Sequence, residues 1–167
     1  MDVPADVVTY DPGWPGLFVE LRGRVDAVLA NVEHVTEHVG STAVPGLAAK
    51  PIIDLDVVVP DEAAVGGAIE ALAAAGWRHE GDLGIKGREA FLPPADVVYH
   101  HLYVVVEGNQ PHRDHIDLRD FLRTHPVQAV RYSALKIRLA ALLKTDRLAY
   151  SNGKSEMIGD FLRQARS

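Results

Sequence analysis

Two aspartates interrupt an apolar segment in the first third of the chain. Asp54 and Asp56 lie within residues 52–59, a run of β-branched side chains that is typical of a β-strand. Side chains two positions apart on a strand point to the same face, so we expect both carboxylates to project together. Two negative charges held that close repel each other, and a divalent cation would keep both ionised in a partly dry site. An edge strand with a solvated polar face would account for the same alternation.

A Gly-Ser turn precedes this strand. Gly40 and Ser41 follow residues 32–39, which we expect to form a strand. Glycine lets the backbone approach a phosphate closely, and the turn would offer amide groups and a hydroxyl to the phosphate oxygens. A tight turn in which Ser41 caps the next helical turn is the alternative. A phosphate on the turn and a cation on the two acids would form complementary halves of one site.

The order of Gly-Ser, a short helical turn and Asp-x-Asp on a strand resembles the nucleotidyltransferase superfamily with the DNA polymerase β type of fold. Over nearly the whole chain, the sequence more closely resembles the GrpB family of that superfamily. The matching stretches are YDPGWPGLF from Tyr10, EHVGSTAVPGLAAKPIIDLDV from Glu37, HHLYVV from His100, LRDFLRTHP from Leu118, LK from Leu135 and YSNGK from Tyr150.

The resemblance implies both a fold and a reaction. The fold would be α/β (α+β), a mixed β-sheet flanked by helices with a helical C-terminal tail, in one domain over residues 1–167. Gly40 and Ser41 would bind a nucleoside triphosphate, with ATP expected. Asp54 and Asp56 would be catalytic and would hold Mg²⁺ or Mn²⁺ while a nucleoside monophosphate moves to a small acceptor.

The sequence departs from the superfamily where a third carboxylate is normally found, on a later strand. One face of the expected strand at residues 97–106 carries no acid; its residues are Val97, Tyr99, His101, Tyr103 and Val105. Relatives in the GrpB family often carry His-x-His there, and Tyr103 replaces the second histidine. We therefore add His101 to the catalytic candidates, as a ligand or a base.

Four basic residues are candidates for nucleotide contacts. Lys50 comes just before the aspartate strand, and Arg88 follows a glycine-rich loop at residues 81–87. Lys136 and Lys154 match GrpB motif positions in the helical tail, as does Tyr150. Each of these side chains has a simpler explanation as a surface or solvated loop residue.

Three further motifs favour structural roles. Arg119 and Arg123 are four apart on an expected helix, where they suit an ion-pair network or a second substrate pocket. His112 and His115 could attract a metal, but a solvated helix start is the favoured interpretation. The Gly-Lys-Ser at Gly153 is not a P-loop, because no strand precedes it and the required earlier glycine is missing.

Helical spacing predicts the elements that must position these groups. We expect a first helix capped at Asp11-Pro12, a second from about residue 60 to 76, a strand at 90–92, helix from about 113 onward and a last helix near 157–162. In the helical tail, the stripe predicted to face the core is Val127, Val130, Ala134, Ile137 and Ala141, widened by Leu135, Leu139 and Leu142.

Composition limits the remaining possibilities. The 167 residues include no cysteine, which excludes thiolate nucleophiles and cysteine-bound zinc. A net charge of −6 makes nucleic acid an unlikely partner, and a cytoplasmic location without membrane attachment is the expectation. The chain could also form a homo-oligomer.

Two alternative functions stay open. One is a non-catalytic accessory module related to the GrpB-like domain fused to dephospho-CoA kinase. The other is a nucleotide-binding sensor without turnover.

Overall fold

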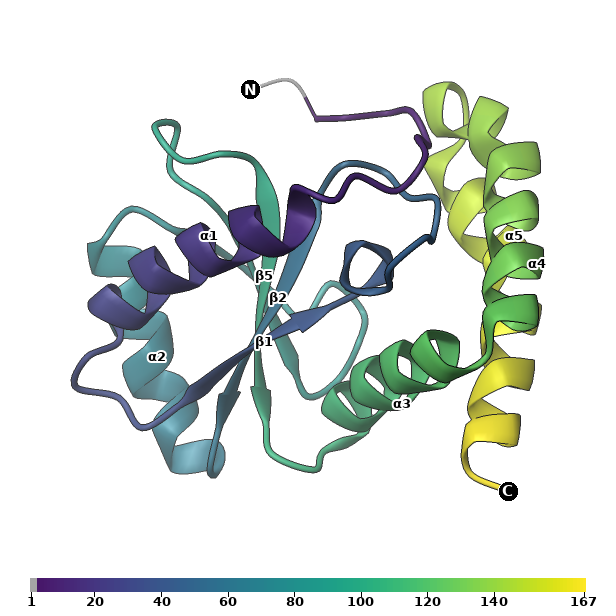
Figure 1. The fold of residues 1–167 in the computed structure, drawn as a ribbon. Helices are drawn as coiled ribbons and strands as arrows, with labels where there is room; N and C mark the ends of the chain where they lie inside the picture. The colour runs from purple at the N-terminus through teal and green to yellow at the C-terminus, as the bar shows by residue number, and fades with distance from the viewer. Residues whose placement is uncertain (1–2) are drawn as a thin grey trace.

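Residues 3–167, the part of the chain that the computed structural model describes, form a five-stranded sheet between two groups of helices (Figure 1). The strands are β1 (Val35–Val39), β2 (Ile53–Val59), β3 (Arg78–Gly81), β4 (Arg88–Leu92) and β5 (His100–Val106). The helices are α1 (Trp14–Val28), α2 (Glu62–Ala74), α3 (Gln110–Thr124), α4 (Pro126–Leu139) and α5 (Arg147–Ala165). Short 3₁₀ helices lie at Ser41–Ala43 and Ala140–Lys144. The predicted mixed sheet with a helical C-terminal tail is confirmed.

The strand order is β1-β2-β5-β4-β3, in which β2 and β5 are parallel and the other neighbours are antiparallel. The register places Asp54 opposite His101 and Asp56 opposite Tyr103. Because β2 lies between β1 and β5, the edge-strand explanation of its two aspartates is wrong. A pair of carboxylates inside a sheet needs partners, and the neighbouring strand and helix must supply them.

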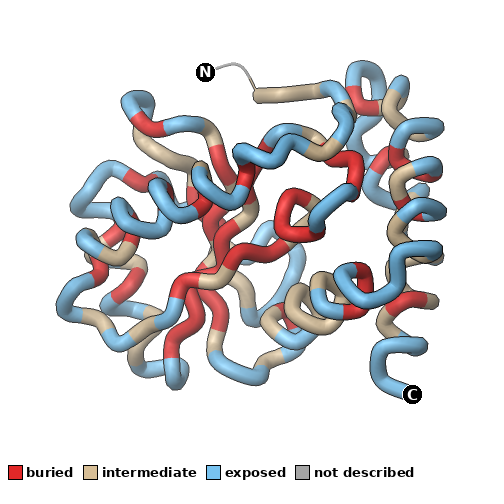
Figure 2. Tube along the Cα trace, viewed as in Figure 1, coloured by how far each residue is buried: buried red, intermediate tan, exposed pale blue. Residues whose placement is uncertain are grey.

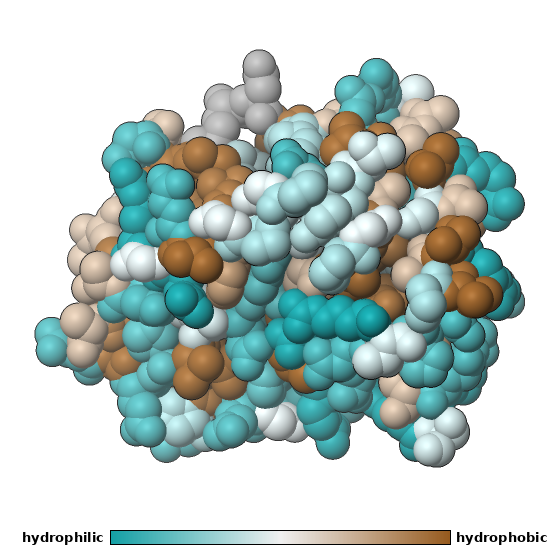
Figure 3. Space-filling model, viewed as in Figure 1, coloured by the Kyte–Doolittle hydropathy of each residue, from teal (hydrophilic) through white to brown (hydrophobic). Residues whose placement is uncertain are grey.

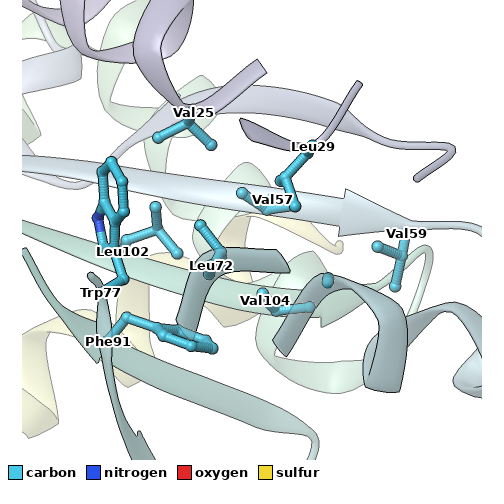
Figure 4. Close-up of a cluster of buried hydrophobic side chains, with 10 residues drawn as sticks. Val25, Leu29, Val57, Val59, Leu72, Trp77, Phe91, Leu102 and Val104 are labelled. Carbon is cyan, nitrogen blue, oxygen red and sulfur yellow. The ribbon is translucent and has the colours of Figure 1, made fainter. Parts of the chain in front are cut away.

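One face of the sheet carries the main hydrophobic core. Alternate residues of β2 and β5 point toward α1 and α2, as the twofold period of a strand requires. Figure 4 shows these side chains meeting between strand and helices, and Figure 2 shows the buried residues concentrated along the central strands. The cluster consists of Val25, Leu29, Val57, Val59, Ala68, Leu72, Trp77, Phe91, Leu102 and Val104.

The opposite face carries the polar residues of β2 and β5 and is approached by α3, α4 and α5. A second apolar cluster fixes these helices to the segment after β1; it consists of Val44, Leu47, Phe121, Leu122, Tyr132 and Phe161. Gly153 has a packing role there, because a Cβ at this position would lie 2.8 Å from Leu139 Cδ1 on α4. The glycine of the Gly-Lys-Ser motif thus lets α5 approach α4 closely.

Three local predictions were wrong. Strand β3 lies where we expected α2 to give way directly to a loop. The first helix begins at Trp14, with Pro15 in its first turn, while Asp11 accepts a hydrogen bond from Gly13 N instead of capping the helix. In the apolar stripe of α4, Val127, Val130 and Ile137 face solvent, whereas Leu135 is buried. No helix within residues 3–167 combines the length and apolar character needed to cross a membrane.

Candidate active site

The Gly-Ser turn lies against the aspartate strand. Val39, at the end of β1, pairs with Asp54, so the chain turns at Gly40 directly over that carboxylate. Gly40 has φ 74° and ψ −174°, a conformation that is essentially restricted to glycine. A Cβ at Gly40 would also collide with Asp54 Oδ2. Glycine is therefore required here both by the backbone and by the close approach of the acid.

A buried histidine anchors this turn from behind. His38 stacks on Phe18 of α1, with ring centroids 4.6 Å apart, and its Nε2 lies 2.9 Å from Thr42 Oγ1. Burial lowers the pKa of His38 to about 4, so the ring is neutral at neutral pH. A neutral ring packed between α1 and the turn has a structural role, which is to fix the position of Ser41.

Asp54 is held by His101 across the β2–β5 pair. His101 Nδ1 donates to Asp54 Oδ1 at 2.8 Å, and the two side chains are 28% and 24% exposed. Burial opposes ionisation of Asp54, but the hydrogen bond and the charge of His101 hold the pKa of this carboxyl below its ordinary value. Asp54 is therefore ionised at neutral pH and faces the cavity.

Asp56 is completely buried and is held by a residue of α3. His115 Nδ1 lies 2.8 Å from Oδ2 and 3.0 Å from Oδ1 of Asp56. Burial raises the pKa of Asp56, and the same hydrogen bond raises the pKa of His115 in spite of burial. The expectation that His112 and His115 are both solvated is wrong for His115, whose ring reaches the sheet. Half-buried His112, three positions earlier on α3, instead accepts a hydrogen bond from Gly108 N.

Tyr103 occupies the place opposite Asp56 on β5. The guanidinium carbon of Arg88 lies 4.4 Å from the centre of the Tyr103 ring, and burial raises the pKa of the phenol. Arg88 Nε is a buried donor without a hydrogen-bond partner among residues 3–167. Such a donor is costly to leave unsatisfied, so its position beside the cavity favours an acceptor on a bound ligand.

Three lysines converge on the same cavity from the other side. Lys136 is 2% exposed, and its Nζ donates to Ser41 Oγ at 2.8 Å. Lys154 and Lys50 lie over the Tyr150 ring, at 4.4 and 5.8 Å from its centroid. None of the ion pairs found in the described residues includes any of these three lysines.

The lysines repel one another and lose hydration. Burial, followed by the charge of Lys154, lowers the pKa of Lys136 to about 7. Burial and the charge of Lys50 lower the pKa of Lys154 to about 8. A polyanion would relieve both effects, because each ammonium group would gain a counter-charge. The lysine cluster (Lys50, Lys136 and Lys154) is thus built for an anionic ligand.

All these groups surround one cavity of about 450 Å³. Asp56 does not line the cavity, but its hydrogen-bond partner His115 does. The other proposed site residues all line it, namely Gly40, Ser41, Lys50, Asp54, Arg88, His101, Lys136 and Lys154. Sequence reasoning missed Tyr132, whose ring lies 4.6 Å from Lys136 Nζ. The spacing of Tyr132 and Lys136, four apart on one helix, could have indicated the contact.

Arg119 and Arg123 act mainly as structural links. Arg119 Nη1 donates to Glu37 Oε2 at 2.8 Å and to the His38 carbonyl at 3.1 Å. Arg123 Nε donates to the Ala43 carbonyl at 2.8 Å. Both arginines therefore tie α3 to β1 and to the turn, although Arg119 also reaches the cavity wall.

The donor set fits a divalent cation that shares its coordination with a ligand. Asp54 and Asp56 supply two carboxylates from one strand face, but no three His, Asp or Glu side chains within residues 3–167 gather closely enough to hold an ion by themselves. Cations at nucleotide sites are commonly held by one or two carboxylates together with phosphate oxygens and water. The arrangement meets that description when a phosphate lies at the Ser41 turn.

Comparisons with known proteins place the chain in a family. A family model described as "GrpB protein" matches residues 4–164. The UPF0157 protein YqkA of Bacillus subtilis is 35% identical over 153 residues, which cover 92% of this chain and 45% of YqkA. The chain thus spans about half the length of that relative. A shorter match, 36% identical over 77 residues, links 44% of the chain to 19% of a dephospho-CoA kinase of Mycolicibacterium paratuberculosis.

Solved structures extend the comparison. The crystal structure of the conserved protein GrpB from Enterococcus faecalis has a TM-score of 0.82 and 30% identity, covering 95% of this chain and 96% of that one. The Cid1 poly(U) polymerase with MgGTP bound has a TM-score of 0.59 and 12% identity, covering 86% of this chain and 46% of Cid1. The second likeness is one of fold alone.

Proposed function

The chain belongs to the GrpB family, and on that premise we propose that it is a nucleotidyltransferase. It would move a nucleoside monophosphate from a nucleoside triphosphate, with ATP as the first candidate, to a small acceptor. An acceptor oxygen forms a bond to the α-phosphorus, the bond from that phosphorus to the oxygen shared with the β-phosphorus breaks, and the acceptor's proton passes to water. Pyrophosphate is the second product.

The proposal depends on one observation. Asp54 lies against the Gly40–Ser41 turn, on the wall of a cavity that Lys136 and Lys154 also line. This juxtaposition supports a site that takes a phosphate chain and a cation together, because the anion-binding groups and the Asp54 carboxylate face the same space.

In this assignment the phosphate chain lies between the turn and the helical tail. Ser41 and the turn's amides would bind its oxygens, with Lys136 held against Ser41 for the same purpose. Lys50, Lys154 and Arg88 would supply further positive charge, and the orphaned Arg88 Nε would gain its acceptor. These residues would align the phosphorus for in-line attack, which is where positioning contributes most to phosphoryl transfer.

Asp54 and Asp56 would hold the cation, Mg²⁺ or Mn²⁺. When bound, it would neutralise charge that develops on the phosphoryl oxygens. His101 fixes the orientation of Asp54 and takes the place beside it where the superfamily normally has a third acid. His115 fixes the orientation of Asp56.

Binding of a nucleotide without turnover is the second candidate function. One observation favours it: Tyr103, covered by Arg88, stands opposite Asp56 in a position where no carboxylate is available. The partial match to a dephospho-CoA kinase supports a related version, in which such a nucleotide-binding module assists a partner enzyme.

Pyrophosphate release separates the two candidates. The wild-type chain would be incubated with each of the four common nucleoside triphosphates, a divalent cation and a panel of small acceptors, beside Asp54→Asn and Asp56→Asn. The exposed Asp96→Asn serves as the control, because the Asp96 side chain is 80% exposed and does not line the cavity. Transferase activity predicts a loss of about 100-fold or more in both site variants and none in the control.

Thermal unfolding in the same samples tests binding. A nucleotide-induced rise in unfolding temperature without pyrophosphate release would favour the binding module. If wild type and site variants behave alike, with neither release nor a thermal shift, both candidate functions are wrong.

A further inference from the structure

One serine of the cavity is in direct contact with a buried lysine. Ser41 lines the cavity and is partly exposed, whereas Lys136 on α4 is only 2% exposed. Lys136 Nζ and Ser41 Oγ lie 2.8 Å apart, although 95 positions separate the two residues in the chain. The serine hydroxyl is therefore more accessible to a ligand than the amine that contacts it.

The surroundings of Lys136 suit a proton acceptor. None of the ion pairs found in residues 3–167 gives this lysine a carboxylate partner. Burial, followed by the charge of Lys154, lowers its pKa to about 7, so a substantial fraction of the amine is unprotonated at neutral pH. In that form the amine accepts the hydrogen bond that the Ser41 hydroxyl donates. A hydroxyl within hydrogen-bond reach of a free base is the arrangement of an activated nucleophile.

The turn holds the serine in this position. Ala43 N donates to the Gly40 carbonyl and Val44 N donates to the Ser41 carbonyl, both at 3.2 Å. The backbone on both sides of Ser41 is thus fixed by hydrogen bonds. Rotation of the Ser41 side chain is the remaining freedom, and it is enough to carry the oxygen from the lysine toward a ligand.

The cavity favours a phosphoryl group as the electrophile. Lys50 and Lys154 line it beside Ser41, and Arg88 Nε is a buried donor without a partner in the described part of the chain. Cationic groups of this kind bind phosphate oxygens and stabilise the charge that develops on a phosphoryl group during transfer. A neutral carbonyl substrate would leave these charges uncompensated, so a phosphoryl donor fits the cavity better than an acyl donor.

We propose that Ser41 is a site of autophosphorylation and that Lys136 is the general base that takes its proton. Ser41 Oγ forms a bond to the terminal phosphorus of a nucleoside triphosphate. The bond from that phosphorus to the oxygen shared with the next phosphorus breaks, and the nucleoside diphosphate leaves with that oxygen. The hydroxyl proton passes to Lys136 Nζ. The inference rests on the proposed function for the nucleotide, but the attack is at a different phosphorus and the product is different.

The modification would regulate the site. A phosphoserine carries a charge of about −1.5 to −2 at neutral pH and three acceptor oxygens, which the lysine cluster can bind. It would occupy the place of a phosphate at the turn and repel an incoming triphosphate. The modified chain should therefore bind ATP about tenfold more weakly or worse.

Mass spectrometry of the full chain incubated with ATP and Mg²⁺ tests the proposal. We expect one phosphoryl group per chain, mapped to Ser41 by fragmentation, with a matching amount of ADP. Ser41→Ala should gain none. Ser151→Ala is the matched control, because Ser151 also lines the cavity but no hydrogen bond found in residues 3–167 joins its Oγ to a lysine. This control should be modified like the wild type.

Lys136→Arg separates proton transfer from charge. Arginine keeps the positive charge but stays protonated, so it cannot take the proton of Ser41. We expect the ATP-induced thermal shift to be retained while phosphorylation of Ser41 slows by about 100-fold. Circular dichroism checks that the larger side chain is accommodated. Lys136→Met, which lacks both charge and base, should weaken the thermal shift as well.

Two results would overturn the inference. One is a wild-type chain that binds ATP but gains no phosphoryl group at Ser41; release of pyrophosphate by that chain would leave the proposed function standing. The other is phosphorylation at the wild-type rate in folded Lys136→Arg. Phosphorylation of Ser41 with ADP as product, but without pyrophosphate for any acceptor, supports the inference and refutes the transferase. A chain that neither binds ATP nor gains a phosphoryl group refutes both.

Discussion

At the scale of single residues, the site combines groups that are costly for folding. Gly40 adopts a backbone conformation that requires glycine, over an ionised carboxylate, and Lys136 is buried without an acidic partner. Neither feature contributes to stability. Costs of this kind are commonly retained at functional sites, where they pre-organise groups for a ligand. Substitutions at these positions should therefore separate stability from binding.

Replacing Gly40 with alanine should be more harmful than an equivalent change nearby. Gly40→Ala introduces both a disfavoured backbone and a clash with Asp54, for which we expect a loss of about 3 kcal/mol or more in unfolding free energy. Gly46→Ala is the matched control, because Gly46 also has positive φ, 82°, but has open space around its Cβ. There we expect a loss of about 1 kcal/mol. Equal losses in urea unfolding would show that the contact with Asp54 is unimportant.

Replacing Lys136 with methionine should stabilise the protein while weakening anion binding. Burial lowers the pKa of this lysine from 10.5 to about 7, so between those values the folded state binds fewer protons than the unfolded state. The free energy of unfolding of the wild type should then rise with pH above about 7, by at most ~1.4 kcal/mol per pH unit from this group. Below about pH 7 the lysine is charged in both states, and the full cost of burying that charge lowers the free energy of unfolding.

Urea unfolding at several pH values checks this linkage. Lys136→Met should raise stability at neutral pH and reduce the slope. Some slope should remain, because burial also lowers the pKa of Lys154, to about 8. A variant with the wild-type slope would contradict the assignment of the pH dependence to Lys136. Binding of inorganic triphosphate, measured by calorimetry, should fall in the same variant.

At the scale of secondary-structure elements, prediction from sequence succeeded where a local residue pattern was compatible with only one structure. The alternation around Asp54 fixed the face of β2, and the family motif placed the turn beside it. Strand β3 was missed because it has only four residues, between glycines, and it exists by pairing with β4. The role of His115 was missed for a related reason, since the contact joins residues 59 apart in the chain. Neither tertiary pairing has a local signal.

Helix α4 shows how periodicity misleads. Its regular apolar stripe was expected to face the core, yet Val127, Val130 and Ile137 are 68%, 69% and 57% exposed. The buried face carries Leu135, from the flank of the predicted stripe, together with Tyr132 and Lys136, which lie outside it. Figure 3 accordingly shows hydrophobic groups on the side of the molecule where α4 and α5 lie. Charged residues are usually assigned to the exposed face of a helix, but here Lys136 is buried. The hydrophobic periodicity therefore predicted the wrong face for Val127, Val130 and Ile137.

Substitutions on the two faces of α4 should differ accordingly. Ile137→Lys, on the exposed face, should change unfolding free energy by no more than about 0.5 kcal/mol. Leu135→Ala, on the 8% exposed position, should cost about 3 kcal/mol because it leaves a cavity. Urea unfolding of both variants measures the contrast. A large loss in Ile137→Lys would mean that the exposed stripe contributes to packing in solution.

At the scale of the whole molecule, the site lies between two parts that fold around different cores. The sheet supplies the Gly-Ser turn, the two acids and His101. The helical tail supplies Lys136, Tyr150 and Lys154, and it is joined to the rest through the cluster that includes Leu47, Phe121 and Phe161. Figure 1 shows α4 and α5 as a separate layer at the right of the molecule. A ligand that contacts both parts binds only when they are docked.

Ligand binding should therefore protect the tail more than the sheet. At a ligand concentration about 100 times the dissociation constant, the docked state gains ~2.7 kcal/mol, which corresponds to about 100-fold slower exchange for amides that open when the tail undocks. Hydrogen exchange with a nonhydrolysable ATP analogue should show this slowing in α4 and α5, with little change in α1 and α2, which pack on the far face of the sheet. Lys136→Met should not show it. Slowing confined to the turn and β2 would place the ligand on the sheet alone and would contradict a role for the lysine cluster, because a ligand that does not reach the tail cannot favour its docking.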